Sequence, residues 1–184
     1  QRIIGWLNQV REQSRTGVAS PAEIHDYRTV LDDMRLIKGS DELQIMQRAA
    51  DISTQAHQRA MQTTCPGMRE YEIEAELLYT FYRHGAQAPA YTSIVAGGAN
   101  ACVLHYVDNN AELKSGDLLL IDAGCELDGY ASDITRTFPI NGRFTPQQRD
   151  VYQLVLAAQL EAIEQVKPGN RWNDPHQAAL RVLA

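Results

Sequence analysis

Four consecutive apolar residues, Leu118 to Ile121, lead directly into Asp122. A run of this length predicts a buried strand. An isolated carboxylate at the end of such a strand would be very costly, so Asp122 should have a positive partner. That partner could be Arg136, another cation or a metal ion.

A second aspartate, Asp133, follows on the next predicted strand. Strand alternation places Asp133 and Arg136 on opposite faces, so Arg136 is a poor direct partner for Asp133. If residues 125–129 form a hairpin, Asp122 and Asp133 lie on adjacent strands and face one cavity. Paired carboxylates suit manganese, magnesium or a two-metal hydrolytic site. The alternative is that one aspartate caps a turn and the other forms a surface ion pair.

The rest of the pattern segregates helices from strands and predicts an α+β fold. Ser40 is a predicted helix N-cap, and Thr145 opens a capping box with proline at the next position. Helices are expected over 3–13, from Ser40 to about residue 64, over 70–84, from Thr145 to about residue 166, and from Asp174 onward. Strands are expected over 93–96, 101–106, 117–123 and 130–138.

Composition restricts the possible partners. The chain has 184 residues, is 44% hydrophobic and carries a formal charge of -6 without a basic run. These values favour a folded domain that binds a small molecule or a peptide, with no nucleic-acid and no membrane partner. Three widely spaced cysteines indicate neither a disulfide framework nor a cysteine zinc site, and they fit a cytoplasmic protein.

The segment from Ile121 to Glu126, together with Gly129-Tyr130 and the stretch from Asp133 to Pro139, closely resembles the first metal-ligand motif of aminopeptidase P. That family belongs to the pita-bread metallopeptidases, with prolidase, methionine aminopeptidase and creatinase. The likeness extends over residues 34–169. It implies one half of a pita-bread fold, with an antiparallel sheet and helices packed on one face.

The resemblance also implies a metal centre. In this family two divalent ions, usually manganese, are held by two aspartates, one histidine and two glutamates. The aspartates correspond to Asp122 and Asp133, and the other ligands are expected beyond Ala184. The expected activity is release of an N-terminal residue that precedes proline. We expect this chain to be a truncated fragment that binds manganese weakly and does not cleave peptides by itself.

The family assigns two further residues to the site. The histidine matching His105 lines the pocket and hydrogen-bonds the substrate, so His105 is the predicted catalytic and substrate-binding histidine, at the end of a strand. Tyr91 matches a tyrosine beside the metal centre and is predicted to bind substrate. The alternatives are a structural histidine and simple packing of the tyrosine. Val107 and Ser132 depart from the usual threonine and glycine of the family.

The remaining expectations concern domains and alternatives. Residues 1–18 are assigned to the end of an N-terminal domain, 19–39 to a linker and 40–184 to the first half of the catalytic domain. A prolidase-type dipeptidase, a creatinase-like hydrolase and a metal-free binding module remain alternatives. The full-length protein is expected to be a homo-oligomer. This chain is expected to self-associate or to have poor stability, because it should expose an apolar sheet face and a strand edge. His25, His57, His84 and His176 are predicted to be surface or helix-end residues.

Overall fold

The computed structural model describes residues 2–23 and 25–184. Contacts between Cα atoms divide the chain into two units, residues 1–40 and residues 41–184. The candidate site lies entirely in the second unit, so the first is described only briefly. None of the helices in the described residues is long and apolar enough to cross a membrane.

The first unit contains helix α1 (Arg2–Glu12), a 3-10 turn η1 (Gln13–Thr16) and helix α2 (Arg28–Leu36). Helix α1 confirms the helix predicted from the apolar face of residues 3–13. Helix α2 was not predicted, because it lies within the stretch interpreted as a linker, residues 19–39.

Two helices form one layer of the second unit. Helix α3 (Ser40–Thr63) and helix α4 (Glu70–Arg83) both match the predicted helices. Their buried residues recur at helical spacing, and they pack with residues of the sheet into one hydrophobic core. The fully buried members of this core include Ala49, Ala56, Ala60, Ile73, Leu77, Phe81, Leu119 and Ile121.

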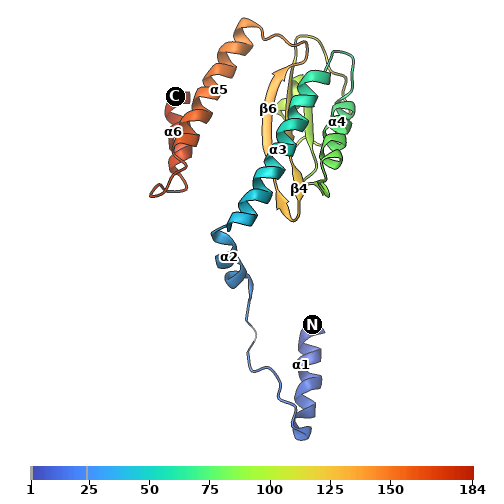
Figure 1. The fold of residues 1–184 in the computed structure, drawn as a ribbon, viewed down its shortest axis with the longest axis vertical. Helices are drawn as coiled ribbons and strands as arrows, with labels where there is room; N and C mark the ends of the chain where they lie inside the picture. Colours follow the sequence, from blue (N-terminus) through green and yellow to red (C-terminus); the bar gives the residue numbers. More distant parts are fainter. Residues whose placement is uncertain (1, 24) are drawn as a thin grey trace. The chain divides into compact units, whose positions relative to one another are not determined.

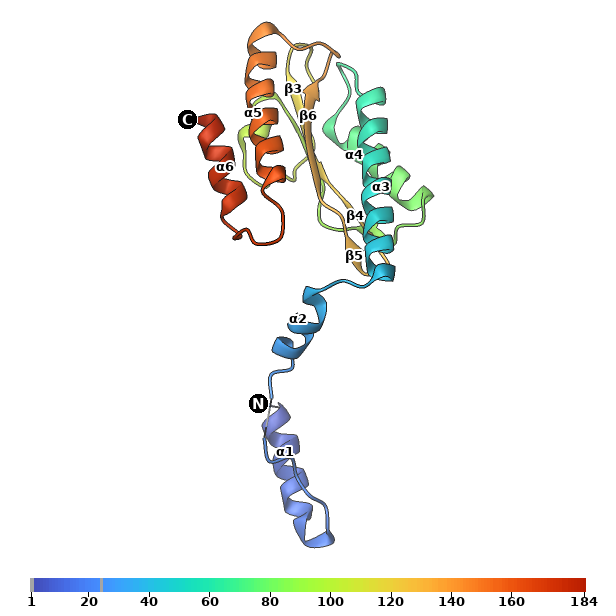
Figure 2. The same ribbon diagram turned by 60° about the vertical axis from the view of Figure 1, so that its left-hand side comes forward.

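The strands form two small antiparallel sheets. One has the order β2-β3-β6 and the other the order β1-β4-β5. The strands are β1 (Ala88–Pro89), β2 (Ile94–Gly97), β3 (Leu118–Ala123), β4 (Cys125–Leu127), β5 (Tyr130–Ala131) and β6 (Ile134–Pro139). Figure 2 shows α3 and α4 on one side of β3 and β6. The predicted α+β class, with an antiparallel sheet and helices packed on one face, is therefore confirmed.

Strand β3 has two different faces. Leu119, Ile121 and Ala123 are fully buried in the core formed with the helices. Leu118 and Asp122 alternate with them and are only partly buried. The strand that leads into Asp122 thus has one apolar face packed on the helices, and Asp122 points away from that layer.

Two strand predictions need correction. Residues 101–106 do not form a strand: a 3-10 helix η2 (Gly98–Cys102) is followed by irregular chain. The strand predicted over 130–138 is interrupted at Ser132 and Asp133, which lie between β5 and β6. In both segments, hydrogen bonds with residues distant in sequence, described below, outweigh the alternation of apolar and polar residues within the segment.

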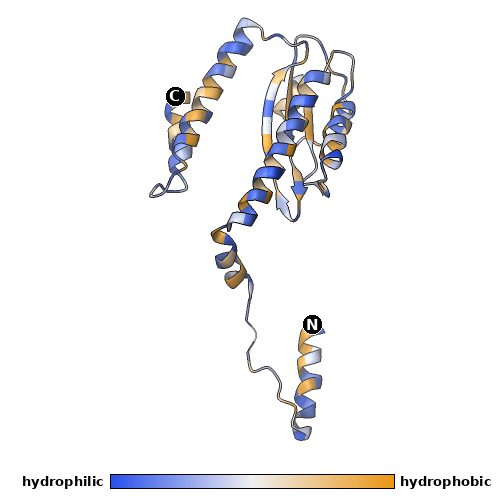
Figure 3. Ribbon diagram, in the orientation of Figure 1, coloured by the Kyte–Doolittle hydropathy of each residue, from blue (hydrophilic) through white to orange (hydrophobic). Residues whose placement is uncertain are grey.

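Helix α5 (Pro146–Glu164) begins as predicted, because Thr145 Oγ1 accepts a hydrogen bond from the amide of Gln148 and the capping box is complete. Helix α6 (Asp174–Leu183) packs against α5, on the other side of the sheet from α3 and α4 (Figures 1 and 2). Figure 3 shows hydrophobic residues along part of α5, and Val151 and Val155 are exposed.

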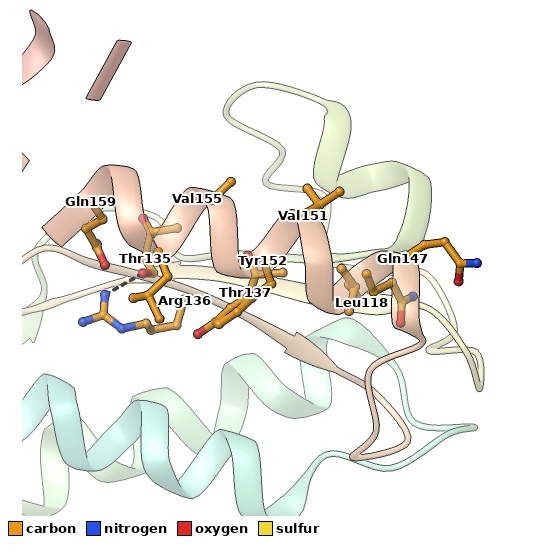
Figure 4. A pocket seen from close by; sticks show the side chains of 11 residues that line it. Leu118, Thr135, Arg136, Thr137, Gln147, Val151, Tyr152, Val155 and Gln159 are labelled. Atoms are coloured by element: carbon orange, nitrogen blue, oxygen red, sulfur yellow. Dashed lines mark hydrogen bonds between the residues drawn. The ribbon is translucent and has the colours of Figure 1, made fainter. Parts of the chain in front are cut away.

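A groove of about 610 Å³ separates α5 from the open face of the sheet. In Figure 4, α5 runs along the strand that carries Thr135, Arg136 and Thr137. Leu118 and Tyr152 also line this groove. The exposed apolar residues of this groove belong to α5, whereas three of the four sheet residues that line it are Thr135, Arg136 and Thr137. The expectation of an exposed apolar sheet face stays a prediction.

Candidate metal centre

The two aspartates meet at the end of the sheet. Asp122 is the next-to-last residue of β3, where it pairs with Thr135 of β6, and Asp133 immediately precedes β6. The Tyr91 hydroxyl lies 2.5 Å from Asp122 Oδ1 and 2.9 Å from Asp133 Oδ1. The predicted hairpin therefore brings Asp122 and Asp133 into one site, and the Tyr91 hydroxyl lies between the two carboxylates.

The charges of this site are not balanced by the protein groups around it. A tyrosine hydroxyl has one proton, so it satisfies both carboxylates only by sharing that proton. Within residues 2–23 and 25–184, neither aspartate forms an ion pair with a lysine, arginine or histidine. Arg136 instead donates to the carbonyl of Thr135. Two adjacent carboxylates with one neutral donor fit a divalent cation, which prefers oxygen ligands.

Burial and the neighbouring carboxylates also affect Tyr91 itself. Partial burial raises the pKa of the Tyr91 hydroxyl, and its hydrogen bonds to Asp122 and Asp133 raise it further. The hydroxyl therefore remains protonated at neutral pH and can act as a hydrogen-bond donor to the carboxylates.

A close backbone contact positions Asp133. A Cβ atom added at Gly124 would lie 1.7 Å from the carbonyl oxygen of Ser132, so only glycine fits between β3 and β4. The amide of Ser132 donates to the carbonyl of Cys125 at 2.9 Å. Together with the hydroxyl contact between Ser132 and Ser53, these contacts hold the chain where the predicted continuous strand is interrupted, directly before Asp133.

His105 faces the same cavity, although its local structure differs from the prediction. It lies in a loop rather than at a strand end, and its φ of 55° is in the left-handed region. The cavity has a volume of about 370 Å³ and is lined by Tyr91, Thr92, Ile94, His105, Val107, Asp122 and Asp133. All four predicted site residues therefore line one cavity.

Sequence reasoning assigned no role to Thr92 or Ile94, and it noted Val107 only as a departure from the family. Ile94 pairs with Asp122 across β2 and β3, so the strand register places it beside the aspartate. The register could not be read from the sequence, because the pairing partner of β2 lies more than twenty residues further along the chain.

The prediction that His57 is a surface or helix-end residue is wrong. His57 is only 3% exposed, and its Nε2 lies 3.2 Å from the carbonyl oxygen of Ala123, the residue after Asp122. Burial lowers the pKa of His57. The signal was present in the sequence, because His57 lies at helical spacing from Ser53 and Ala60 on the buried face of α3.

Asp122 and Asp133 are two candidate metal ligands. In the described part of the chain, no group of three or more histidine, cysteine, aspartate or glutamate side chains could hold a metal ion. A pair of carboxylates beside a cavity is typical of the class of metal-dependent hydrolases, in which further ligands complete the site.

The sequence matches the metallopeptidase family M24 over residues 44–184, and the chain belongs to this family. It is 53% identical over 161 residues to the Xaa-Pro aminopeptidase of Haemophilus influenzae, covering 88% of this chain and 37% of that protein. The chain thus spans little more than a third of the length of such relatives.

Solved structures show the same fold. The Pseudomonas aeruginosa aminopeptidase PepP is 51% identical, with a TM-score of 0.95 that covers 99% of this chain and 41% of that chain. A zinc-substituted Escherichia coli aminopeptidase P in complex with product is 44% identical, with a TM-score of 0.92 over 96% of this chain and 40% of that chain. The fold is one half of the pita-bread fold, as the sequence predicted.

Proposed function

We propose that this chain supplies part of the active site of a metal-dependent aminopeptidase that releases an N-terminal residue preceding proline. The observation that carries the proposal is the convergence of Asp122 and Asp133 on one cavity, joined by the Tyr91 hydroxyl. The names of the similar proteins support the same activity, since they include Xaa-Pro aminopeptidases.

Asp122 and Asp133 would hold two divalent ions, for which we propose manganese, together with one histidine and two glutamates from outside this chain. A pair of bound ions supplies a lowered pKa for water and polarisation of the scissile carbonyl. The Tyr91 hydroxyl orients the two carboxylates by donating to them.

The cavity residues would receive the peptide. His105 is placed to hydrogen-bond the substrate and is the proposed catalytic histidine of this half. The Tyr91 ring, Ile94 and Val107 give the cavity an apolar wall on which a proline ring or an apolar side chain can pack. We further propose that the full-length protein is a cytoplasmic homo-oligomer.

Metal analysis and peptide cleavage by the full-length protein test the proposal. We expect bound divalent metal, cleavage of a tripeptide with proline in second position, and loss of both in Asp122→Asn and Asp133→Asn. Asp150→Asn, an exposed change on α5, is the matched control and should change neither. Cleavage restricted to dipeptides would instead support the prolidase-type alternative, and a metal-free, inactive protein would support a binding module.

The isolated chain of 184 residues should bind manganese weakly and should not cleave the same peptide, because it contributes only two carboxylates. Calorimetric titration with manganese and an overnight peptide assay test this. Measurable turnover by the isolated chain would contradict the proposed division of the active site.

A further inference from the structure

Glu70 is a carboxylate with no solvent contact. It is the first residue of α4 and is 0% exposed. Burying a carboxylate is unfavourable unless hydrogen bonds satisfy its oxygens. Burial raises the pKa of Glu70, but hydrogen bonds from four donors outweigh this effect and hold the pKa below its usual range. Glu70 is therefore a buried anion that is stabilised entirely by neutral groups.

The four donors all belong to one segment, residues 97–111. The amide of Gly97 and the side-chain amide of Asn100 donate to Oε1 at 2.8 and 3.0 Å. The Tyr106 hydroxyl and the amide of Ala111 donate to Oε2 at 2.7 and 2.9 Å. One carboxylate thus binds both ends of the segment and two side chains between them.

Residues 97–111 include His105, which lines the cavity of the two aspartates. Local packing does not hold His105 in this position. His105 itself is exposed, and the preceding Leu104 is 86% exposed. The left-handed φ of His105 is a strained backbone conformation, which persists only where the surroundings determine it. The nearest such constraint is the hydrogen bond from the adjacent Tyr106 to Glu70.

Asn109 provides a second, independent attachment. Its side chain accepts from the amide of Val95 and donates to the carbonyl of Ser93, so it ties the later part of the segment to β2. Its side chain also donates to Glu74 Oε2 of α4, and among the hydrogen bonds of the described residues its side chain has none to the part of the segment before His105. Glu70 is therefore the group that holds residues on both sides of His105.

We propose that Glu70 is a positioning residue that holds His105 in place for substrate, acting through Tyr106 and Asn100. The proposal rests on the proposed function of His105, and it assigns Glu70 no contact with substrate or metal. Loss of a hydrogen bond to the Glu70 carboxylate should make residues 97–111 more mobile and lower kcat/KM for the peptide. The proposed metal ligands Asp122 and Asp133 would remain in place.

The test uses the full-length protein with Tyr106→Phe, Glu70→Gln and the control Glu72→Gln. Glu72 is also in the first turn of α4, but it is exposed and accepts a hydrogen bond from the amide of Arg69. Tyr106→Phe removes one anchor without changing a charge, so it remains informative if Glu70→Gln does not fold.

We expect Tyr106→Phe and Glu70→Gln to lower kcat/KM by about tenfold with unchanged metal content, and Glu72→Gln to behave as wild type. In a His105→Ala background, Tyr106→Phe should change kcat/KM by less than about twofold, because its effect passes through His105. Full additivity of the two changes would overturn the proposal.

Hydrogen exchange provides a readout independent of activity. Amides of residues 98–108 should exchange about tenfold faster in Tyr106→Phe, while those of β3 stay unchanged. If the wild-type protein cleaves no Xaa-Pro peptide, the proposed function fails and exchange alone decides whether Glu70 holds the segment. Unchanged exchange would overturn the positioning role even in an active enzyme.

Discussion

The Oγ atom of Ser132 lies 2.7 Å from the Oγ atom of Ser53, and this buried contact joins the residue before Asp133 to helix α3. The amide of Cys125 donates to both hydroxyls, at 3.0 and 3.1 Å. The two serines therefore attach the turn before Asp133 to helix α3. The contact depends on the hydroxyl of the Ser132 side chain.

The first prediction concerns this contact. Ser132→Ala should lower the free energy of unfolding by about 1 to 2 kcal/mol, because it removes a buried hydroxyl that both donates and accepts. Ser93→Ala is the matched control, since the Ser93 hydroxyl is buried and has no hydrogen-bond partner among the described residues. The control should be neutral or slightly stabilising in urea unfolding, and equal losses for the two variants would contradict the assignment.

The second prediction concerns Tyr91. Tyr91→Phe keeps the ring in the cavity but removes the hydroxyl that donates to Asp122 and Asp133. Metal affinity of the full-length protein should fall by roughly 10- to 100-fold, as when other groups that orient metal ligands are removed. Calorimetric titration measures this, with Tyr79→Phe, a change at an exposed tyrosine of α4, as the control. Unchanged affinity would show that the hydroxyl does not orient the carboxylates.

The third prediction concerns Gly124. Gly124→Ala should destabilise the fold by more than about 4 kcal/mol, because the new Cβ would lie 1.7 Å from a backbone oxygen that cannot move away freely. Gly116→Ala has open space but a φ of 94°, so backbone strain alone should cost about 1 to 2 kcal/mol. Thermal unfolding ranks the two variants, and similar losses would mean that the Gly124 contact relaxes.

The fourth prediction concerns acid stability. The pKa of Glu70 in the folded state is lowered, so its stabilisation is fully present above the unfolded value of about 4.3. That stabilisation is lost as the pH falls through the lower folded pKa. Glu70→Gln should therefore be less stable than wild type at pH 7, and the difference should narrow between pH 4 and pH 2. A difference that stays constant in urea unfolding across this range would contradict it.

The fifth prediction concerns the groove between α5 and the sheet. The isolated chain should self-associate, because Val151, Val155 and Leu156 remain exposed on α5. Val155→Glu should reduce the apparent mass in sedimentation experiments. Val30→Glu, at a comparably exposed valine outside the groove, should not. A wild-type chain that stays monomeric at high concentration would contradict the prediction.

Much of the site follows from local pattern. The apolar run before Asp122 predicts β3, the capping box at Thr145 predicts α5, and the two aspartates of the motif predict the candidate metal site. Each depends on a few neighbouring residues whose spacing already fixes burial or backbone hydrogen bonding. The bounds of β3 and α5 agree with the predictions to within about two residues, and the metal site stays a prediction.

The tertiary structure alone decided the path of residues 98–111 and the break at Ser132. In both cases the deciding partner is distant in sequence: Glu70 for the loop and Ser53 for Ser132. A strand pattern over 101–106 was wrong because hydrogen bonds to a buried carboxylate outweigh a weak local preference. The sequence by itself identified the candidate site residues, and only long-range packing and hydrogen bonding determined how they are held together.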